Sequence, residues 1–293
     1  MTTPKIAVIG LGLMGAPIAG RLLDAGFALT VWNRTQGKAE SLIARGAQWA
    51  ASPAAAAADA ETVIVMVTDD QAVRSVIAGS DGVLAGLRPG AVLIDMSTIL
   101  PATSRAMAAA TAERGGHYLD CPVSGSTDVV ARGALAIFAG GEAAALDRCR
   151  DVLAPLAGSV THMGASGAGT ATKLVVNGIM GIGIEAIAEG LALGAGLGLE
   201  RDALIGALAG TNAVSPSQKK RLEAAGRDDF TPGFTLANLL KDFGLILSAA
   251  AEAGVPMPAL ATAAHIAAVA PAAARALDCG VTIRTVAGLA KPG

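Results

Sequence analysis

The sequence predicts an α/β domain followed by an all-helical domain, and its length and two successive patterns of apolar residues support that prediction. At 293 residues the chain has room for two domains of ordinary size. In the first half, short apolar runs rich in β-branched residues alternate with segments of helical periodicity, which is typical of βαβ units in a parallel sheet. After about Gly169 the periodicity is helical throughout. We therefore expect one domain over residues 1–165 and another over residues 166–293.

The expected strands of the first domain are short apolar runs bounded by turn-forming residues. In chain order they are Lys5–Ile9, Ala28–Trp32, Thr62–Val67, Ala91–Ile94, His117–Leu119, Leu135–Phe138 and Ser159–His162. Ser52 and Pro53 supply an N-cap and a first-turn proline, so the alanine run Ala54–Ala58 is predicted to be a short helix. The segment Glu142–Leu156 also has a helical pattern.

The second domain is predicted to consist of helices separated by proline and glycine. Its most apolar segment, Leu174–Leu199, is long enough to span a membrane but contains Asn177, Glu185 and Glu189. Because carboxylates are costly in lipid, we expect a buried helix of a soluble protein and no membrane partner. Further helices are expected over Arg201–Leu208, Ser217–Ala225, Leu236–Ala253 and Ala259–Ala276.

Composition argues against several classes of protein. Lys and Arg total 22 against 24 Asp and Glu, with no basic block, so a nucleic-acid partner is not expected. Hydrophobic residues make up 53% of the chain, which excludes disorder. Neither the histidines nor Cys121, Cys149 and Cys279 have the spacing of metal ligands, so no metal is expected. Unpaired cysteines and an N-terminus without a leader-like pattern predict a cytoplasmic protein.

A glycine motif, GLGLMG, follows the first expected strand and opens a helix expected to run to about Ala25. In that setting the first glycine permits a tight turn, the second lets the backbone approach a pyrophosphate, and the third allows close helix–strand packing. The N–H groups at the helix start then face the phosphates. Ordinary turns also use glycine, but this context favours a Rossmann dinucleotide-binding domain. Its expected cofactor-binding residues are Gly10, Leu11, Gly12, Leu13, Met14 and Gly15.

The end of the second strand indicates which dinucleotide binds. A site selective for NAD places a carboxylate there, whereas this chain has Asn33, Arg34 and Thr35. Arg34 can pair with a 2′-phosphate, and Asn33 and Thr35 can donate hydrogen bonds to it. The alternative is that Arg34 is a solvated charge at a strand end. We expect NADP(H), with Val67 and Thr68 as further cofactor-binding residues.

Two later segments carry groups suited to a substrate. Ser124 and Gly125 follow a short strand and offer a hydroxyl and N–H groups to a carboxylate, although an ordinary loop has the same composition. Lys173 lies near the first turn of an apolar helix, with Asn177 four residues further on the same face. Desolvation and the helix dipole should lower the pKa of Lys173 from about 10.4, which suits a general acid/base. A lysine that snorkels from the helix end is the plainer alternative.

In combination these motifs resemble the β-hydroxyacid dehydrogenase family over nearly the whole chain. The resemblance rests on Gly10–Gly15, Asp95–Thr98 (DMST), Pro122–Gly125, Gly167–Asn177 and the pair Lys241 and Asp242. Within the family, the chain is most similar to the glyoxylate/succinic semialdehyde reductase branch, at Val31–Thr35 (VWNRT), DMST, Ser124–Ser126 and Leu174–Gly181 (LVVNGIMG).

The resemblance implies that Lys173 and Asn177 are catalytic, with Lys173 as the acid/base and Asn177 fixing the substrate oxygen or the lysine. Ser124 and Gly125 are expected to bind the substrate carboxylate together with Asn177. It also implies roles for residues that carry no signal of their own. Thr98 and Lys241 are expected to contact the cofactor, and Phe234 and Asp242 to line the substrate cleft. Without the family, Lys241 and Asp242 would be interpreted as a charge pair on a helix surface.

The reaction implied is NADPH-dependent reduction of a small carboxylated aldehyde, of the glyoxylate, succinic semialdehyde or tartronate semialdehyde type, to its hydroxy acid. Oxidation of the 3-hydroxyisobutyrate dehydrogenase type and imine reduction are alternatives, although imine reductases typically lack a lysine at the position of Lys173. A non-catalytic NADP-binding protein is a further alternative, against which Lys173, Asn177 and Ser124 argue. The apolar surface of Leu174–Leu199 exceeds what one small domain covers, which predicts a homodimer or homotetramer.

Three departures from the family pattern concern the substrate. Ser126 stands where many members have a second glycine, and Cys121 stands where alanine is common. The segment Leu277–Thr282 does not follow the Gly- and Asp-rich ending of the family, which lies near the substrate cleft. These departures therefore bear on the identity of the substrate more than on the hydride chemistry.

Overall fold

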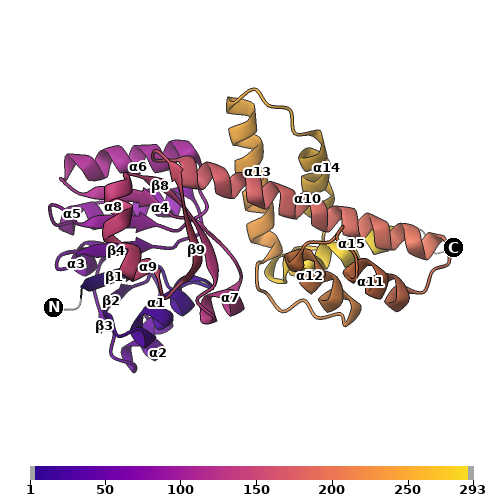
Figure 1. Cartoon of the computed structure of the whole chain (residues 1–293), viewed down its shortest axis with the longest axis horizontal. Coiled ribbons are helices and arrows are strands. Elements are labelled where there is room, and N and C mark those ends of the chain that lie inside the picture. Colours follow the sequence, from indigo (N-terminus) through magenta and orange to yellow (C-terminus); the bar gives the residue numbers. More distant parts are fainter. Residues whose placement is uncertain (1–3, 290–293) are drawn as a thin grey trace. The chain divides into compact units, whose positions relative to one another are not determined.

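The computed structural model describes residues 4–289, which form two compact units (Figure 1). The first unit ends at Lys173 and contains a sheet with helices on both faces. The second begins at Leu174 and is helical throughout its described residues, apart from turns and one isolated β-bridge. The predicted fold class is therefore confirmed. Helix α10 (Ala168–Gly196) belongs to both units, because its first residues fall in the first unit and the rest in the second.

One sheet of nine strands spans the first unit within residues 4–289. The strands are β1 (Lys5–Ile9), β2 (Ala28–Trp32), β3 (Gln48–Trp49), β4 (Thr62–Val65), β5 (Val92–Asp95), β6 (His117–Asp120), β7 (Val123–Ser124), β8 (Leu135–Gly141) and β9 (Ala157–Gly164). Their order is β3-β2-β1-β4-β5-β6-β8-β7, and β9 pairs with β8. The two-residue strands β3 and β7 are too short to show a periodicity in the sequence.

The sheet is parallel from β3 to β6, as predicted, but β8 runs antiparallel to both β6 and β7. Strand β7 continues from β6 after only two residues, and residues 125–134 then join it to β8. A parallel pair needs a crossover of about a dozen residues or more, so this short connection returns the chain antiparallel. The longer connection from β8 to β9 contains two helices, and that pair is parallel again.

Helices of the first unit fill the connections between strands. They are α1 (Gly15–Asp24), α2 (Glu40–Ile43), α3 (Pro53–Ala57), α4 (Asp70–Ala78), α5 (Val83–Gly86), α6 (Pro101–Glu113), α7 (Thr127–Ala131), α8 (Ala143–Arg148) and α9 (Arg150–Leu153), with a 3₁₀ helix η1 over Gln36–Ala39. The predicted N-cap of α3 is present, because the Ala55 N–H donates to Ser52 Oγ at 3.1 Å. The segment predicted as one helix over Glu142–Leu156 is divided into α8 and α9 at Cys149.

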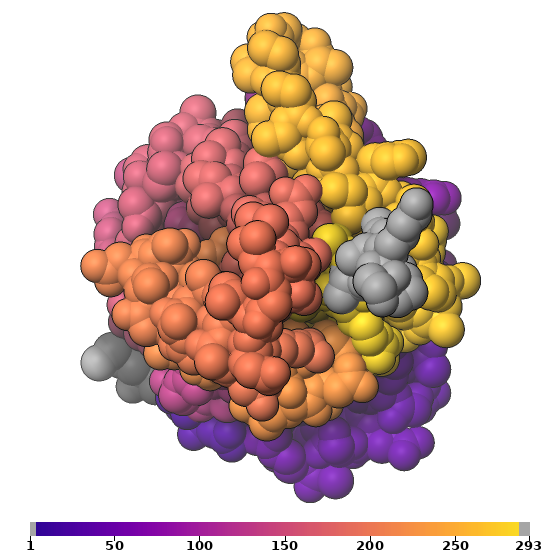
Figure 2. Space-filling model, turned by 90° about the vertical axis from the view of Figure 1, so that its right-hand side faces the viewer, coloured from indigo at the N-terminus to yellow at the C-terminus, as the bar shows by residue number. Residues whose placement is uncertain are grey.

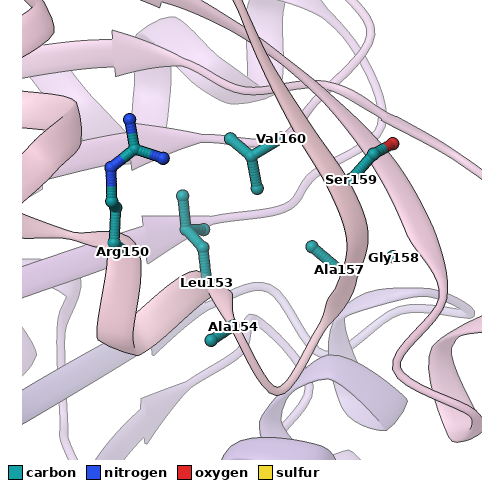
Figure 3. A pocket seen from close by; sticks show the side chains of 7 residues that line it. All are labelled: Arg150, Leu153, Ala154, Ala157, Gly158, Ser159 and Val160. Carbon is teal, nitrogen blue, oxygen red and sulfur yellow. The ribbon is translucent and has the colours of Figure 1, made fainter.

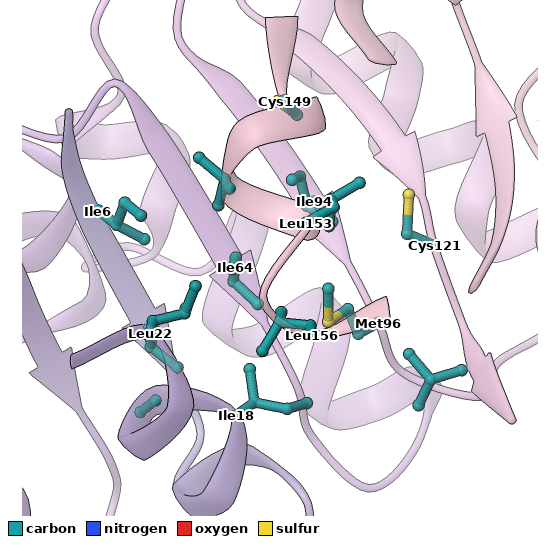
Figure 4. Packing of buried hydrophobic residues seen from close by; sticks show 14 of the residues in the cluster. Ile6, Ile18, Leu22, Ile64, Ile94, Met96, Cys121, Cys149, Leu153 and Leu156 are labelled. Carbon is teal, nitrogen blue, oxygen red and sulfur yellow. The ribbon is translucent and has the colours of Figure 1, made fainter. Parts of the chain in front are cut away.

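The core of the first unit lies on both faces of the sheet, because successive residues of each central strand point to opposite sides. In β1, Ile6 and Val8 pack on one face, while Ala7 and Ile9 pack on the other. Figure 4 shows the first of these clusters, in which Ile18 of α1 and other helix residues cover the strands. A sheet buried on both faces is rigid, and it presents the carboxyl ends of its parallel strands to ligands.

The second unit is formed by α10 and shorter helices that pack on it (Figure 2). These are α11 (Arg201–Ala209), α12 (Pro216–Gly226), α13 (Leu236–Glu252), α14 (Pro258–Ala268) and α15 (Thr282–Leu289), with 3₁₀ helices η2 (Ala272–Ala276) and η3 (Cys279–Val281). The helix predicted over Ala259–Ala276 ends at Ala268, because Pro271 disfavours helical backbone before it and lacks an N–H.

Helix α10 is the core helix of this unit, yet it also has an exposed apolar face. Gly181 lies against the ring of Phe243 on α13 so closely that a Cβ at this position would overlap the ring. Within the described residues, α10 alone is long and apolar enough to cross a membrane, and 44% of its most apolar window is buried inside the chain. Val175, Ile179 and Leu193 on the same helix are 63%, 69% and 64% exposed.

Candidate active site

The glycine motif forms the turn between β1 and α1, and each glycine there has a different reason to lack a side chain. Gly10 has a φ of +96°, and a Cβ at this position would overlap the carbonyl of Met66. A Cβ at Gly15 would overlap the carbonyl of Gly10, at the start of α1. A Cβ at Gly12 would meet no protein atom within 4 Å. Gly12 therefore faces open space that a pyrophosphate can approach, so these residues fit a dinucleotide.

Asn33, at the end of β2, joins that strand to the glycine motif. Its Oδ1 accepts a hydrogen bond from the Leu11 N–H at 2.9 Å, and its Nδ2 donates to the Thr35 carbonyl at 2.9 Å. The amide of Asn33 is therefore used to shape the turn beside the motif. Arg34 and Thr35 are exposed, so the guanidinium of Arg34 is accessible to a ligand at this strand end.

A buried hydrogen-bond chain supports the next two loops along the sheet. The Val67 N–H after β4 donates to Ser97 Oγ at 3.0 Å, and the Ser97 N–H donates to Asp95 Oδ1 at 2.9 Å. The Tyr118 hydroxyl donates to Asp95 Oδ2 at 3.1 Å. Burial raises the pKa of Asp95 to about 6, although the hydrogen bonds from Ser97 and Tyr118 oppose the shift. This chain fixes Val67 beside the segment that contains the half-buried Thr98.

Asp120, the last residue of β6, holds the start of α10. Its Oδ1 accepts from the Gly167 N–H at 2.8 Å, and its Oδ2 accepts from the Thr170 N–H at 2.8 Å. The side chain is fully buried, and a Cβ at Gly169 would overlap the Asp120 and Phe138 carbonyls. A carboxylate here satisfies N–H groups that have no partner inside the helix and interacts favourably with its dipole. The first turns of α10, which lead to Lys173, are thereby fixed to the sheet.

Ser124 and Gly125 lie at the end of β7. Ser124 pairs with Ala136 of β8 and is half-buried. Gly125 is exposed with a φ of +139°, and a Cβ there would lie 2.8 Å from side-chain atoms of Leu135 and Val129. The backbone at Gly125 therefore requires glycine, and this exposed residue directly follows Ser124.

Three of the predicted site residues come together in the second unit. Asn177 Nδ2 on α10 donates to Asp242 Oδ2 on α13 at 2.6 Å, and Lys241 Nζ lies 2.9 Å from Asp242 Oδ1. Asn177 and Asp242 are only 3% and 1% exposed. The Asp242 carboxylate thus orients the Asn177 amide, and Lys241 compensates its buried charge. Because α10 is continuous, Lys173 and Asn177 lie one helical turn apart.

Four supporting residues were not predicted to have a role in the site: Asp95, Ser97, Asp120 and Thr170. Asp95 and Ser97 belong to the DMST motif, which contributed to the family resemblance, but of that motif only Thr98 was given a role. A shallow pocket between α9 and β9 contains none of the predicted residues, as Figure 3 shows, and its one charged side chain is Arg150.

Comparisons with known proteins agree with this architecture. Residues 5–164 match the family model of the NAD binding domain of 6-phosphogluconate dehydrogenase. Residues 167–284 match the model described as NAD-binding of NADP-dependent 3-hydroxyisobutyrate dehydrogenase. Both units are therefore accounted for by dehydrogenase families.

Individual relatives span nearly the full chain. A 2-(hydroxymethyl)glutarate dehydrogenase of Eubacterium barkeri is 33% identical over 89% of this chain and 87% of its own. An NAD-dependent L-serine dehydrogenase of Pseudomonas aeruginosa is 36% identical over 88% of this chain and 89% of its own. A solved structure of Mycobacterium tuberculosis 3-hydroxyisobutyrate dehydrogenase with L-serine has a TM-score of 0.87 and 34% identity, covering 97% of this chain and 99% of that one. The chain belongs to the β-hydroxyacid dehydrogenase family and is an NAD(P)-dependent oxidoreductase acting on CH–OH groups.

Proposed function

We propose that this enzyme is an NADPH-dependent reductase of small carboxylated aldehydes, of the glyoxylate/succinic semialdehyde reductase branch. The observation that carries the proposal is the placement of Lys173 at the start of α10, where the buried carboxylate of Asp120 holds the helix. A lysine fixed one turn into an apolar helix is suited to proton transfer at a substrate oxygen. The VWNRT, DMST and LVVNGIMG motifs support the choice of branch.

In the proposed reaction the chain's residues orient the aldehyde and supply a proton. Ser124 and the Gly125 N–H anchor the substrate carboxylate, together with Asn177. When bound, NADPH supplies the hydride that the aldehyde carbon accepts. The ammonium of Lys173 donates its proton to the carbonyl oxygen as negative charge develops there, which leaves a hydroxy acid and a neutral lysine. Anchoring the remote carboxylate holds the carbonyl in a reactive geometry and accounts for much of the rate.

The preference for NADPH is assigned to the end of β2. Arg34 is exposed at that strand end, and the segment 33–35 contains no carboxylate to bind a ribose hydroxyl or repel a 2′-phosphate. Leu11–Gly15, Val67, Thr68, Thr98 and Lys241 complete the proposed cofactor site. Relatives of this family include both NAD- and NADP-dependent enzymes, so the distinction requires its own measurement.

An NADPH-oxidation screen over glyoxylate, succinic semialdehyde, tartronate semialdehyde, methylmalonate semialdehyde and a cyclic imine tests the proposal. We expect the highest kcat/KM with one of the carboxylated aldehydes and lower values with NADH throughout. Turnover of the imine alone, or of none of the five, would contradict the assigned reaction. The test requires only purified enzyme and absorbance measurements.

A second candidate is oxidation of a hydroxy acid, favoured by relatives named for L-serine and 2-(hydroxymethyl)glutarate. In that direction neutral Lys173 accepts the hydroxyl proton while hydride leaves the same carbon. NADP⁺ reduction with L-serine and 3-hydroxyisobutyrate measures this activity. A higher kcat/KM there than with every aldehyde would select this candidate.

We also infer that two or more copies associate through α10, as a homodimer or homotetramer. Val175, Ile179, Leu193 and Leu197 are each more than 60% exposed along this helix and the residue after it. Large apolar side chains that are exposed in this number along one helix are typical of an interface. A monomeric mass by light scattering at micromolar concentration would refute the inference.

The free, buried cysteines of the chain support a reducing, cytoplasmic compartment.

A further inference from the structure

The carboxylate of Asp278 joins three segments of the second unit that are distant in sequence. Its Oδ2 accepts hydrogen bonds from the N–H groups of Gly233 at 3.1 Å and Phe234 at 3.0 Å. Its Oδ1 accepts from Arg221 Nε at 3.0 Å and from the Gly280 N–H at 3.0 Å. The side chains of Arg221 and Asp278 are 12% and 13% exposed, so this network is largely shielded from water. Charge-assisted hydrogen bonds in such a setting hold their partners strongly.

Backbone hydrogen bonds extend the same contact. Segment 230–236 lies against segment 277–279, with an antiparallel bridge between Thr235 and Asp278. The Asp278 N–H donates to the Phe230 carbonyl at 2.9 Å, and the Cys279 N–H donates to the Phe234 carbonyl at 2.8 Å. The backbone of Phe234 is therefore held at both its N–H and its carbonyl by the 277–279 segment.

This contact also places Phe234 relative to α13. The half-buried Phe234 packs against the core of the second unit, and the next residue, Thr235, is the N-cap of α13. The Thr235 Oγ1 accepts from the Asn238 N–H at 3.2 Å. Helix α13 carries Asp242, whose carboxylate orients Asn177. Asp278 thus fixes the position of the Phe234 backbone at the beginning of the helix that supports Asn177.

We propose that Asp278 is a positioning residue that sets substrate specificity through Phe234. The inference rests on the proposed function, in which Phe234 lines the substrate site. When the backbone of Phe234 is fixed, its ring limits the length of the aldehyde that fits beside it. When the backbone is loosened, the ring can move, and the enzyme discriminates less between aldehydes of different length.

The test compares glyoxylate with succinic semialdehyde, which differ in chain length, in the wild type and in Asp278→Ala. We expect the KM of the preferred aldehyde to rise about tenfold and the ratio of kcat/KM values between the two aldehydes to approach unity. The KM for NADPH and the kcat should stay within about twofold, because the Asp278 carboxylate binds Arg221, Gly233, Phe234 and Gly280, none of which is assigned a role in proton or hydride transfer.

Arg221→Gln is the matched control. It removes the ion pair and its hydrogen bond but leaves the three backbone N–H groups bound to Asp278. We expect both this variant and Asp278→Ala to lose thermal stability, and only this variant to keep the wild-type KM and selectivity. Equal kinetic changes in both variants would show that loss of stability is the cause, and would overturn the proposal.

Two further measurements distinguish an effect through Phe234 from a general loss of stability. Hydrogen exchange of the Gly233 and Phe234 amides should accelerate in Asp278→Asn and Asp278→Ala but not in Arg221→Gln. In a Phe234→Ala background, Asp278→Ala should change KM and selectivity by less than twofold, because it acts through the ring. Additive effects would refute the role of Phe234. A wild type that reduces none of the aldehydes contradicts the proposed function, whereas an active enzyme whose Asp278 variants keep its selectivity contradicts only this assignment.

Discussion

Replacement of Glu185 by glutamine should change how the stability of the protein depends on pH. Glu185 lies on α10 within the helical unit and is only 3% exposed. Neither of its carboxyl oxygens forms a well-oriented hydrogen bond with another described residue. The hydroxyl of Thr282 interacts with it weakly, since that hydroxyl donates its proton to the Cys279 carbonyl at 3.0 Å. Burial, opposed by Thr282 and assisted by Glu189, raises the pKa of Glu185 from 4.5 to about 7.

The sign and size of the effect follow from linkage. Between pH 4.5 and 7 the folded state holds a proton on Glu185 that the unfolded state has lost. The free energy of unfolding therefore falls as the pH rises through this window and is constant above it. The difference between a pKa of 4.5 and one of about 7 corresponds to at most ~3.5 kcal/mol of stability. In Glu185→Gln this loss of stability is removed, but burial of a glutamine amide with few hydrogen-bond partners offsets part of the gain.

Urea unfolding at pH 5 and pH 8, followed by circular dichroism, measures the change. Glu185→Gln should be about 1–2 kcal/mol more stable than the wild type at pH 8 and no more stable at pH 5. Glu189→Gln is the matched control, because Glu189 is exposed one turn further along the same helix, and it should shift stability by less than about 0.5 kcal/mol. An identical pH dependence in Glu185→Gln and the wild type would refute the reasoning.

Other predictions concern the proposed site. Lys173→Ala should lower kcat by about 10²–10⁴ with little change in NADPH affinity, and near-normal turnover would remove Lys173 from the acid/base role. Arg34→Asp should raise the KM for NADPH about tenfold or more while sparing NADH, and an unchanged ratio of kcat/KM values would contradict the cofactor assignment. Gly12→Val should weaken NADPH binding about tenfold or more, as fluorescence titration would show, yet leave the unfolding free energy within about 0.5 kcal/mol, because a Cβ there meets no protein atom. Asp120→Asn should lower the unfolding free energy by about 2–3 kcal/mol in urea, since one N–H at the start of α10 loses its ionised acceptor; unchanged stability would show that the contact is unimportant.

The sequence predicted those features that depend on residues close together in the chain. The N-cap at Ser52, the glycine motif after β1 and the division into an α/β and a helical region all have local signals, and all are present. The antiparallel direction of β8 was not predicted, because it depends on a connection length that apolar periodicity does not show.

The supporting groups of the site were beyond prediction for a different reason. Asp120 binds N–H groups 47 and 50 residues further along the chain, and Asp278 binds N–H groups 44 and 45 residues before it. Such pairs are defined only once the sheet and helices are assembled. The roles assigned to Lys173, Ser124 and Phe234 remain predictions until the variants are measured.

Because α10 is shared by both units, the chain has no convenient place to be cut. A fragment that stops at residue 164, where the strand β9 ends, would lack the N–H groups of Gly167 and Thr170. The Asp120 carboxylate would then lose the donors of both its oxygens, which destabilises the end of β6. A dissection aimed at an independently folding nucleotide-binding fragment should therefore include the first turns of α10 and end at an exposed position within the helix, such as Val175.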